Sequence, residues 1–209
     1  GKGSRPSTFY FSGVADVIKT FSAQREFFEY LIEDTLAKKF NRKIRDGKFA
    51  LLGVAYKGGT GSVLASPSLE LVKWLLEERV GKIYIYDPYA KEEFEKWVER
   101  MKKDPTIDED LRAQFSSAFY EFVDPKLPQD PNDEAELNRL KLEAISETMA
   151  QGTAAAIIAA DLPEVRDLLT PIDIARAIKS RPVFDGCGVF GHQVDGSERI
   201  SLREVYDAG

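Results

Sequence analysis

The chain has few of the residues that build metal centres or covalent cross-links. It contains one cysteine and one histidine among 209 residues. A single cysteine forms no intramolecular disulfide, and one histidine with one cysteine does not make the usual zinc ligand set. The acidic residues at positions 104–110 lack the spacing and the glycine of an EF-hand loop, which favours a solvated face. We therefore expect no metal site and no oxidising compartment.

Long apolar runs and an excess of positive charge are also lacking. No apolar run reaches the roughly 18 residues that a membrane span needs, and 35 acidic against 29 basic residues leave a net charge of −6. Such a surface repels phosphate backbones, although a local basic pocket for one small anion is compatible with it. The sequence predicts a soluble, cytoplasmic protein without nucleic-acid or membrane partners. Residues 1–20 begin without Met in a polar stretch and are interpreted as a tag or linker-like start.

Short apolar runs alternate with helical patterns along the rest of the chain. Strands are expected at residues 49–53, 82–86, 118–123, 154–160 and 182–185, and helices at 22–41, 67–80, 133–149 and 171–179. Strands that alternate with helices indicate βαβ units. The predicted fold is α/β, a Rossmann-like, mainly parallel sheet with helices on both faces, preceded by a long connecting helix. The helix segment takes residues 21–48 and the α/β domain residues 49–209.

Two helix starts and one insertion refine this prediction. Ser22 is the expected N-cap of the first helix, and Ser66 followed by Pro67 is the expected start of the next. Residues 91–131 are highly charged and hold four of the ten prolines, so they are interpreted as an inserted surface elaboration that begins with an amphipathic helix. The proline-containing stretch 124–132 should be a loop.

A glycine-rich loop follows the first expected strand. Residues 53–61 contain four glycines together with Lys57, and such a loop lets backbone N–H groups and the next helix N-terminus approach an anion. The loop fails the Walker A pattern because Gly59 replaces its lysine, and Gly53-Val54-Ala55 breaks the dinucleotide fingerprint. Spacing alone leaves two interpretations open: an anion site, or a turn that is glycine-rich for packing.

Several segments together resemble a known family. Residues 49–57 read Phe-Ala-Leu-Leu-Gly-Val-Ala-Tyr-Lys, Thr60 and Ser66-Pro67 follow, and residues 83–89 read Ile-Tyr-Ile-Tyr-Asp-Pro-Tyr. Residues 155–164 and the Val-Phe-Asp-Gly of residues 183–186 continue the pattern. The order and spacing of these segments are similar to the C-terminal, UDP-binding domain of the UDP-glucose/GDP-mannose dehydrogenase family.

This resemblance implies an activity for an intact protein and a ligand for this domain. Members of the family oxidise the C6 hydroxyl of a UDP- or GDP-sugar with NAD, which binds mainly on another domain, and their catalytic cysteine would precede residue 1. The resemblance implies that Tyr56 and Lys57 contact the nucleotide-sugar, with Gly58, Thr60 and Cys187 in the same substrate site. No catalytic residue and no cofactor are expected in this chain, which should be inactive alone.

Two departures from the family pattern keep a second interpretation open. Leu64 and Cys187 stand where the family has arginines, and neither can replace a bidentate, permanently charged side chain. A non-catalytic nucleotide-binding or assembly module would carry the same changes. The only histidine, His192, is expected in a surface loop, so a structural Cys187 is favoured over a nucleophile. A homodimer could form through Phe27 and Phe28.

Overall fold

A six-stranded parallel sheet is the centre of the computed structural model, which describes residues 14–169, 181–187 and 199–201. The strand order is β3-β2-β1-β4-β5-β6, and each of the five pairings is parallel. The strands are β1 (Lys48–Leu52), β2 (Lys82–Tyr86), β3 (Tyr120–Phe122), β4 (Ala155–Ile158), β5 (Val183–Asp185) and β6 (Arg199–Ser201). The predicted fold class is confirmed.

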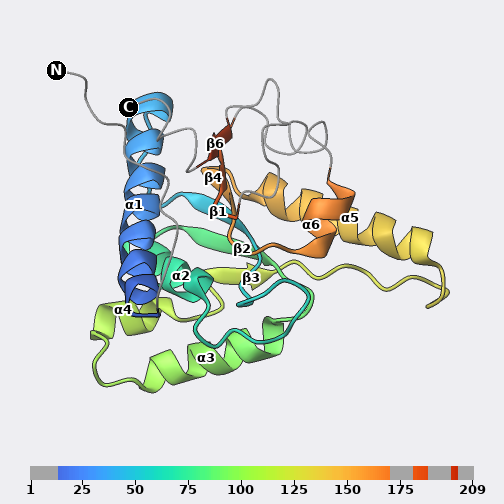
Figure 1. The fold of residues 1–209 in the computed structure, drawn as a ribbon, viewed down its shortest axis with the longest axis horizontal. Helices are drawn as coiled ribbons and strands as arrows, with labels where there is room; N and C mark the ends of the chain where they lie inside the picture. The colour runs from blue at the N-terminus through green and yellow to red at the C-terminus, as the bar shows by residue number, and fades with distance from the viewer. Residues whose placement is uncertain (1–13, 170–180, 188–198, 202–209) are drawn as a thin grey trace.

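Helices cover both faces of this sheet (Figure 1). They are α1 (Val14–Phe40), α2 (Pro67–Glu77), α3 (Lys91–Lys103), α4 (Glu109–Gln114), α5 (Glu134–Gln151) and α6 (Pro163–Leu168). Successive side chains of a strand point to opposite faces. Phe49 and Leu51 of β1 accordingly pack with α1, α2, α3 and α4, whereas Ala50 and Leu52 pack with α5 and α6. All four are fully buried, as expected of a strand covered on both faces.

The two predicted helix starts have different outcomes. The start of α2 is confirmed: Ser66 is the N-cap, its hydroxyl accepts a hydrogen bond from the Ser68 amide at 3.3 Å, and Pro67 is the first helical residue. The first helix, in contrast, begins at Val14 and continues through Ser22 to Phe40. The prediction of Ser22 as an N-cap is wrong, because a serine can occupy a helix interior as well as a cap.

The structure also changes the interpretation of residues 91–131. The helix α3 is amphipathic, as predicted, but Phe94, Trp97 and Phe115 are buried and pack with the core formed by α1 and α2. Ring centroids lie 5.4 Å apart for Phe94 and Trp97 and 5.3 Å apart for Trp97 and Phe115. The segment up to β3 therefore belongs to the sheet and its covering layer. Only the strand-free connection from β3 to α5 extends away from the sheet (Figure 1).

The remaining secondary-structure predictions include one confirmed helix and two that the described residues do not cover. The helix predicted at residues 133–149 is α5, for which the Asp133 side chain is the N-cap and accepts from the Glu136 amide at 2.9 Å. The short helices α4 and α6 and the strand β6 were not predicted. The helix expected at residues 171–179 and the loop of His192 lie outside the described residues. The domain boundaries themselves remain predictions.

Candidate functional site

A cavity lies where the strand order reverses. The chain passes from β1 to β2 on one side of the sheet, and β4 flanks β1 on the other side. Ligands of open α/β sheets bind in the crevice outside the carboxyl ends of the strands at such a switch point. Here a cavity of about 540 Å³ is lined by residues that follow β1, β4 and β5, by the starts of α2 and α6, and by Phe28 of α1. We call it the switch-point pocket.

The structure brings four of the five predicted site residues together. Tyr56, Lys57 and Gly58, which follow β1, and Cys187, which follows β5, all line the switch-point pocket. Thr60 is not among the lining residues. Its hydroxyl and its amide both donate to the Lys57 carbonyl, at 2.6 and 3.2 Å, so it closes the turn that presents Lys57. The role of all five residues in substrate binding remains a prediction.

Close packing explains two of the loop glycines. A Cβ on Gly58 would lie 1.7 Å from the Asp161 carbonyl oxygen, and a Cβ on Gly53, whose φ is +91°, would lie 2.5 Å from the Cβ of Ala160. Any side chain at these positions would therefore force the loop after β1 away from the loop after β4. The packing interpretation of the glycine-rich turn holds at these two positions, and this packing draws the two loops together at the pocket.

Asp87, at the end of β2, holds the start of the glycine-rich loop. It is only 1% exposed. Its Oδ2 accepts hydrogen bonds from the amides of Val54 and Ala55, at 2.9 and 3.0 Å, and its Oδ1 accepts from the Tyr89 amide at 3.1 Å. Desolvation raises the pKa of this carboxyl, and the backbone hydrogen bonds offset part of that rise. Both oxygens are thus used by the fold itself.

The charge of the pocket comes from Lys57, Arg166 and Asp161. Arg166 pairs with Asp161 at 3.1 Å and with Asp167 at 3.0 Å, so its charge is largely neutralised. Lys57 is exposed, and no ion-pair partner for it lies among the described residues. The start of α2 adds little for an anion, because Pro67 has no N–H and the Ser68 amide is already capped. Lys57 is therefore the cation that an anionic ligand would meet.

Cys187 is exposed as a residue, yet its thiol is partly desolvated by the atoms around it and is not activated. Desolvation, with smaller contributions from the carboxylates of Asp185 and Asp161, raises the pKa of the thiol to about 12. The thiolate is the reactive form of cysteine, so the thiol is protonated and weakly nucleophilic at neutral pH. The preference for a non-nucleophilic Cys187 agrees with this environment.

The apolar wall of the pocket includes Phe28, which the sequence analysis assigned to a homodimer contact. Phe28 is 9% exposed and packs edge-on against Phe184 of β5, with ring centroids 6.3 Å apart. The expectation that Phe28 provides an exposed surface for self-association is wrong, because its ring is part of the core and of the pocket wall. Leu71 and Pro67 of α2 extend the same wall.

Sequence reasoning also missed Arg166 and Asp161 as pocket residues. Both follow β4. The strand-to-helix transition marked by Pro163 at the start of α6 is a signal for both, and Asp161 also lies in the resembling segment 155–164, but neither signal indicated a pocket. In the described part of the chain, no cluster of His, Cys, Asp or Glu could hold a metal ion. No helix within those same residues is long and apolar enough to cross a membrane.

The strand order and the pocket at its reversal define the class of this protein: a Rossmann-like α/β domain with a cavity at the switch point, where open α/β sheets bind ligands. Residues 50–114 match the model of the UDP-glucose/GDP-mannose dehydrogenase family, UDP binding domain. The match covers the end of β1, the glycine-rich loop, α2, β2, α3 and α4, less than half of the chain, and confirms the resemblance over these elements. No curated protein matches the chain.

Solved structures of similar fold include two sugar-nucleotide dehydrogenases. The UDP-D-ManNAc dehydrogenase of Pyrococcus horikoshii is 19% identical, with a TM-score of 0.52 over 85% of this chain and 30% of that one. The NDP-N-acetyl-D-galactosaminuronic acid dehydrogenase of Methanosarcina mazei Go1 is 13% identical, with a TM-score of 0.55 over 96% of this chain and 33% of that one. At these identities the likeness is one of fold, and the chain spans about a third of their length.

Proposed function

We propose that the switch-point pocket binds the nucleotide part of a UDP-sugar, and that the chain is the nucleotide-sugar-binding domain of a UDP-glucose 6-dehydrogenase-like oxidoreductase. One observation carries the proposal: at the carboxyl edge of the sheet, the structure joins the cation Lys57 to an apolar wall in one cavity of about 540 Å³. The family match to a UDP binding domain over residues 50–114 supports the same ligand class.

The chemistry of the pocket suits a flat base joined to an anion. Phe28 and Leu71 offer apolar surface to a base, and Tyr56 adds an exposed ring at the rim. Lys57 offers a compact cation with three donors to a diphosphate. The size of the base that this wall accepts would decide the preference between UDP and GDP.

The residues of this chain do not fit a dinucleotide cofactor at the same place. In dinucleotide-binding folds an acid near the end of the second strand binds a ribose hydroxyl. Asp87 occupies the end of β2, but both of its oxygens accept backbone hydrogen bonds. Asp87 is therefore not available to bind a ribose of the NAD that the resemblance implies for an intact enzyme. We propose that the chain alone gives no NADH from NAD and UDP-glucose.

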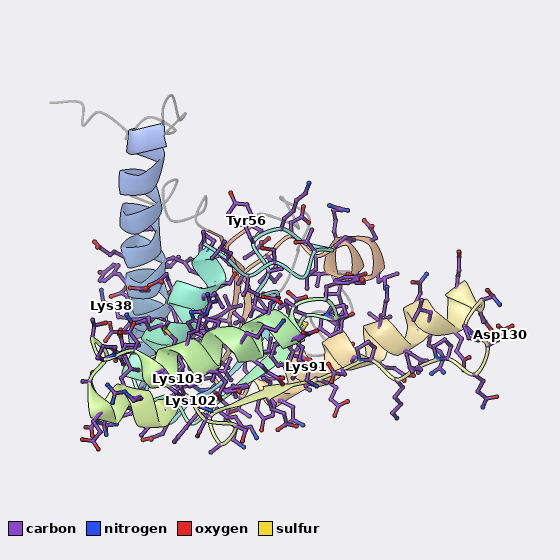
Figure 2. The ribbon with its side chains drawn as sticks, turned by 90° about the horizontal axis from the view of Figure 1, so that it is seen from below. Lys38, Tyr56, Lys91, Lys102, Lys103 and Asp130 are labelled. Carbon is purple, nitrogen blue, oxygen red and sulfur yellow. The ribbon has the colours of Figure 1, made fainter. Side chains whose placement is uncertain are left out.

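Calorimetric titration with UDP tests the proposal, with Lys57→Ala and Lys103→Ala as matched variants. Lys103 is an exposed lysine on α3, and Figure 2 places it well away from Tyr56. We expect saturable binding by the wild-type protein, a loss of about tenfold in affinity for Lys57→Ala because a charge-assisted contact is removed, and no change for Lys103→Ala. Equal affinities for the two variants would remove Lys57 from the site, and no binding by the wild-type protein would end the proposal.

A second candidate function is a non-catalytic nucleotide-binding or assembly module. Leu64 favours it, because this apolar side chain is 72% exposed at the position where the resemblance expects an arginine. Turnover of any UDP- or GDP-sugar by the intact protein would exclude this alternative. The cytoplasmic location, the homodimer and the lack of a nucleic-acid partner remain predictions from the sequence.

A further inference from the structure

Tyr89 lies between the two loops that form the rims of the switch-point pocket. It follows β2, and its hydroxyl donates a hydrogen bond to Glu164 Oε1 at 2.6 Å. This hydrogen bond, together with desolvation, raises the pKa of Tyr89 to about 12, so the hydroxyl is protonated and donates at neutral pH. Tyr89 itself is not among the lining residues of the pocket.

On one side, Glu164 fixes the rim that follows β4. Glu164 is in the first turn of α6 and is only 5% exposed. Its Oε1 also accepts from Lys141 Nζ of α5, at 2.9 Å. Asp161 and Pro163, immediately before it, line the pocket, and Arg166 lies half a turn beyond. The position of Glu164 therefore determines the position of this rim.

On the other side, the segment around Tyr89 fixes the rim that follows β1. Asp87 accepts the amides of Val54 and Ala55, directly before the pocket residues Tyr56 and Lys57, and it accepts the Tyr89 amide as well. Gly61 of the same loop lies so close that a Cβ there would be 2.8 Å from the Tyr89 carbonyl oxygen. One short segment, residues 87–89, thus contacts both rims.

We propose that the hydrogen bond between the Tyr89 hydroxyl and the Glu164 carboxylate is a latch that holds the two rims of the pocket at the separation that the ligand needs. Tyr89 and Glu164 are then positioning residues, which act through Tyr56, Lys57 and Asp161 and do not touch the ligand. The effect on affinity rests on the proposed function, whereas the effect on the rims does not.

Glu164 forms a cluster with Tyr89, Lys141 and Tyr86, and the composition of this cluster supports a positioning role for the hydrogen bond over a purely stabilising one. Glu164 Oε2 and the hydroxyl of the fully buried Tyr86 have no hydrogen-bond partner among the described residues. The charge of Glu164 contributes to the raised pKa of Tyr86, so the two groups interact. Burial of a carboxylate with an unsatisfied oxygen and of an unsatisfied hydroxyl typically gives less stability than apolar side chains of the same shape. Stability alone would therefore not select this cluster, whereas a fixed distance between two loops requires a directional bond.

The test removes the Tyr89 hydroxyl and follows both rims in the free protein. Tyr89→Phe keeps the half-exposed ring, and Tyr30→Phe is the matched control, because the exposed Tyr30 hydroxyl also donates to a carboxylate, that of Asp34 at 3.4 Å. Amide hydrogen exchange is measured for residues 54–60, 161–166 and, as an internal reference, 91–103. We expect Tyr89→Phe to accelerate exchange in both rims about 5- to 10-fold, with no change in the reference segment, and Tyr30→Phe to change none of them.

UDP affinity supplies the second readout. If wild-type protein binds UDP, Tyr89→Phe should weaken binding about 3- to 10-fold, and Glu164→Gln, which keeps an acceptor for Tyr89, should retain more affinity than Glu164→Ala. Unchanged exchange in both rims would overturn the latch, as would acceleration that extends equally to residues 91–103. If wild-type protein does not bind UDP, the proposed function fails, and the exchange measurement alone decides the latch.

Discussion

Replacing Asp87 should destabilise the protein at the edge of the sheet that carries the pocket. Asp87 accepts three backbone N–H groups, and two of them belong to Val54 and Ala55, which are fully buried. In Asp87→Ala these two donors lose their partner, and each buried unsatisfied donor costs about 1–3 kcal/mol. The third donor, on the exposed Tyr89, can be hydrated by solvent and adds little.

The expected net loss of unfolding free energy is smaller than the sum of these two costs. Removal of the carboxylate also removes the desolvation penalty that raises the pKa of Asp87. We therefore expect Asp87→Ala to lose about 2–4 kcal/mol, and Asp87→Asn, whose amide keeps one acceptor, to lose about half as much. Equilibrium unfolding in guanidinium chloride measures both, provided that the slope m is unchanged.

A surface aspartate provides the control for this series. Asp130 is exposed at the tip of the connection before α5 (Figure 2), so Asp130→Ala should change the unfolding free energy by less than about 0.5 kcal/mol. If Asp87→Ala is as stable as Asp130→Ala, the assignment of Asp87 to the fold is refuted. If it is equally stable and loses UDP affinity, Asp87 contacts the ligand.

Three further outcomes follow from the geometry. Gly58→Ala should lose at least about 2 kcal/mol of unfolding free energy, because its Cβ would lie 1.7 Å from the Asp161 carbonyl oxygen. Gly59→Ala has only a positive φ of 74° to accommodate and should lose about 1 kcal/mol. Equal losses for the two variants would contradict the packing argument. The thiol of Cys187 should react with a disulfide reagent at pH 7 much more slowly than free cysteine does, because its pKa is raised to about 12. Absorbance of the released thiol measures the rate, and a rate equal to that of free cysteine would contradict a desolvated thiol. The hydrogen bonds from Tyr89 and Lys141 outweigh desolvation and lower the pKa of Glu164. The ionised carboxylate therefore contributes to stability near neutral pH, and this contribution is lost as the pH falls from about 5 to about 3. The difference in unfolding free energy between the wild-type protein and Glu164→Gln should shrink over that range, and a constant difference would contradict an ionised, paired carboxylate.

The sequence predicted the elements whose signals are local. The apolar run of β1 and the Ser66-Pro67 start of α2 each need only a few neighbouring residues, and both agree with the structure within one residue. Ser22 was misassigned because a cap residue is also tolerated inside a helix, and only the whole backbone distinguishes the two positions. The amphipathic character of α3 was predicted, but the high charge of residues 91–131 led to their interpretation as a surface insertion, whereas the apolar face of α3 packs Phe94 on the core.

Most of the pocket residues that were predicted lie on one loop, and Cys187, which the resemblance indicated after β5, is the exception. Tyr56, Lys57 and Gly58 are adjacent in the sequence, so the resemblance and the glycine pattern found all three. Phe28 and Arg166 enter the pocket from α1 and α6, and no local pattern indicates which distant segments meet at the switch point. The functions of Asp87 and Glu164 depend on which donors surround each carboxylate, and that information exists only in three dimensions.

An amide-resolved NMR titration with UDP tests the central claim most directly, because it reports binding and location together. The account predicts saturable shifts at Lys57 and Gly58 after β1, at Asp161 after β4 and at Gly186 after β5, the three segments that the switch-point pocket joins, with little change along α3. Shifts confined to residues outside the pocket, or no saturable shift at all, would contradict it.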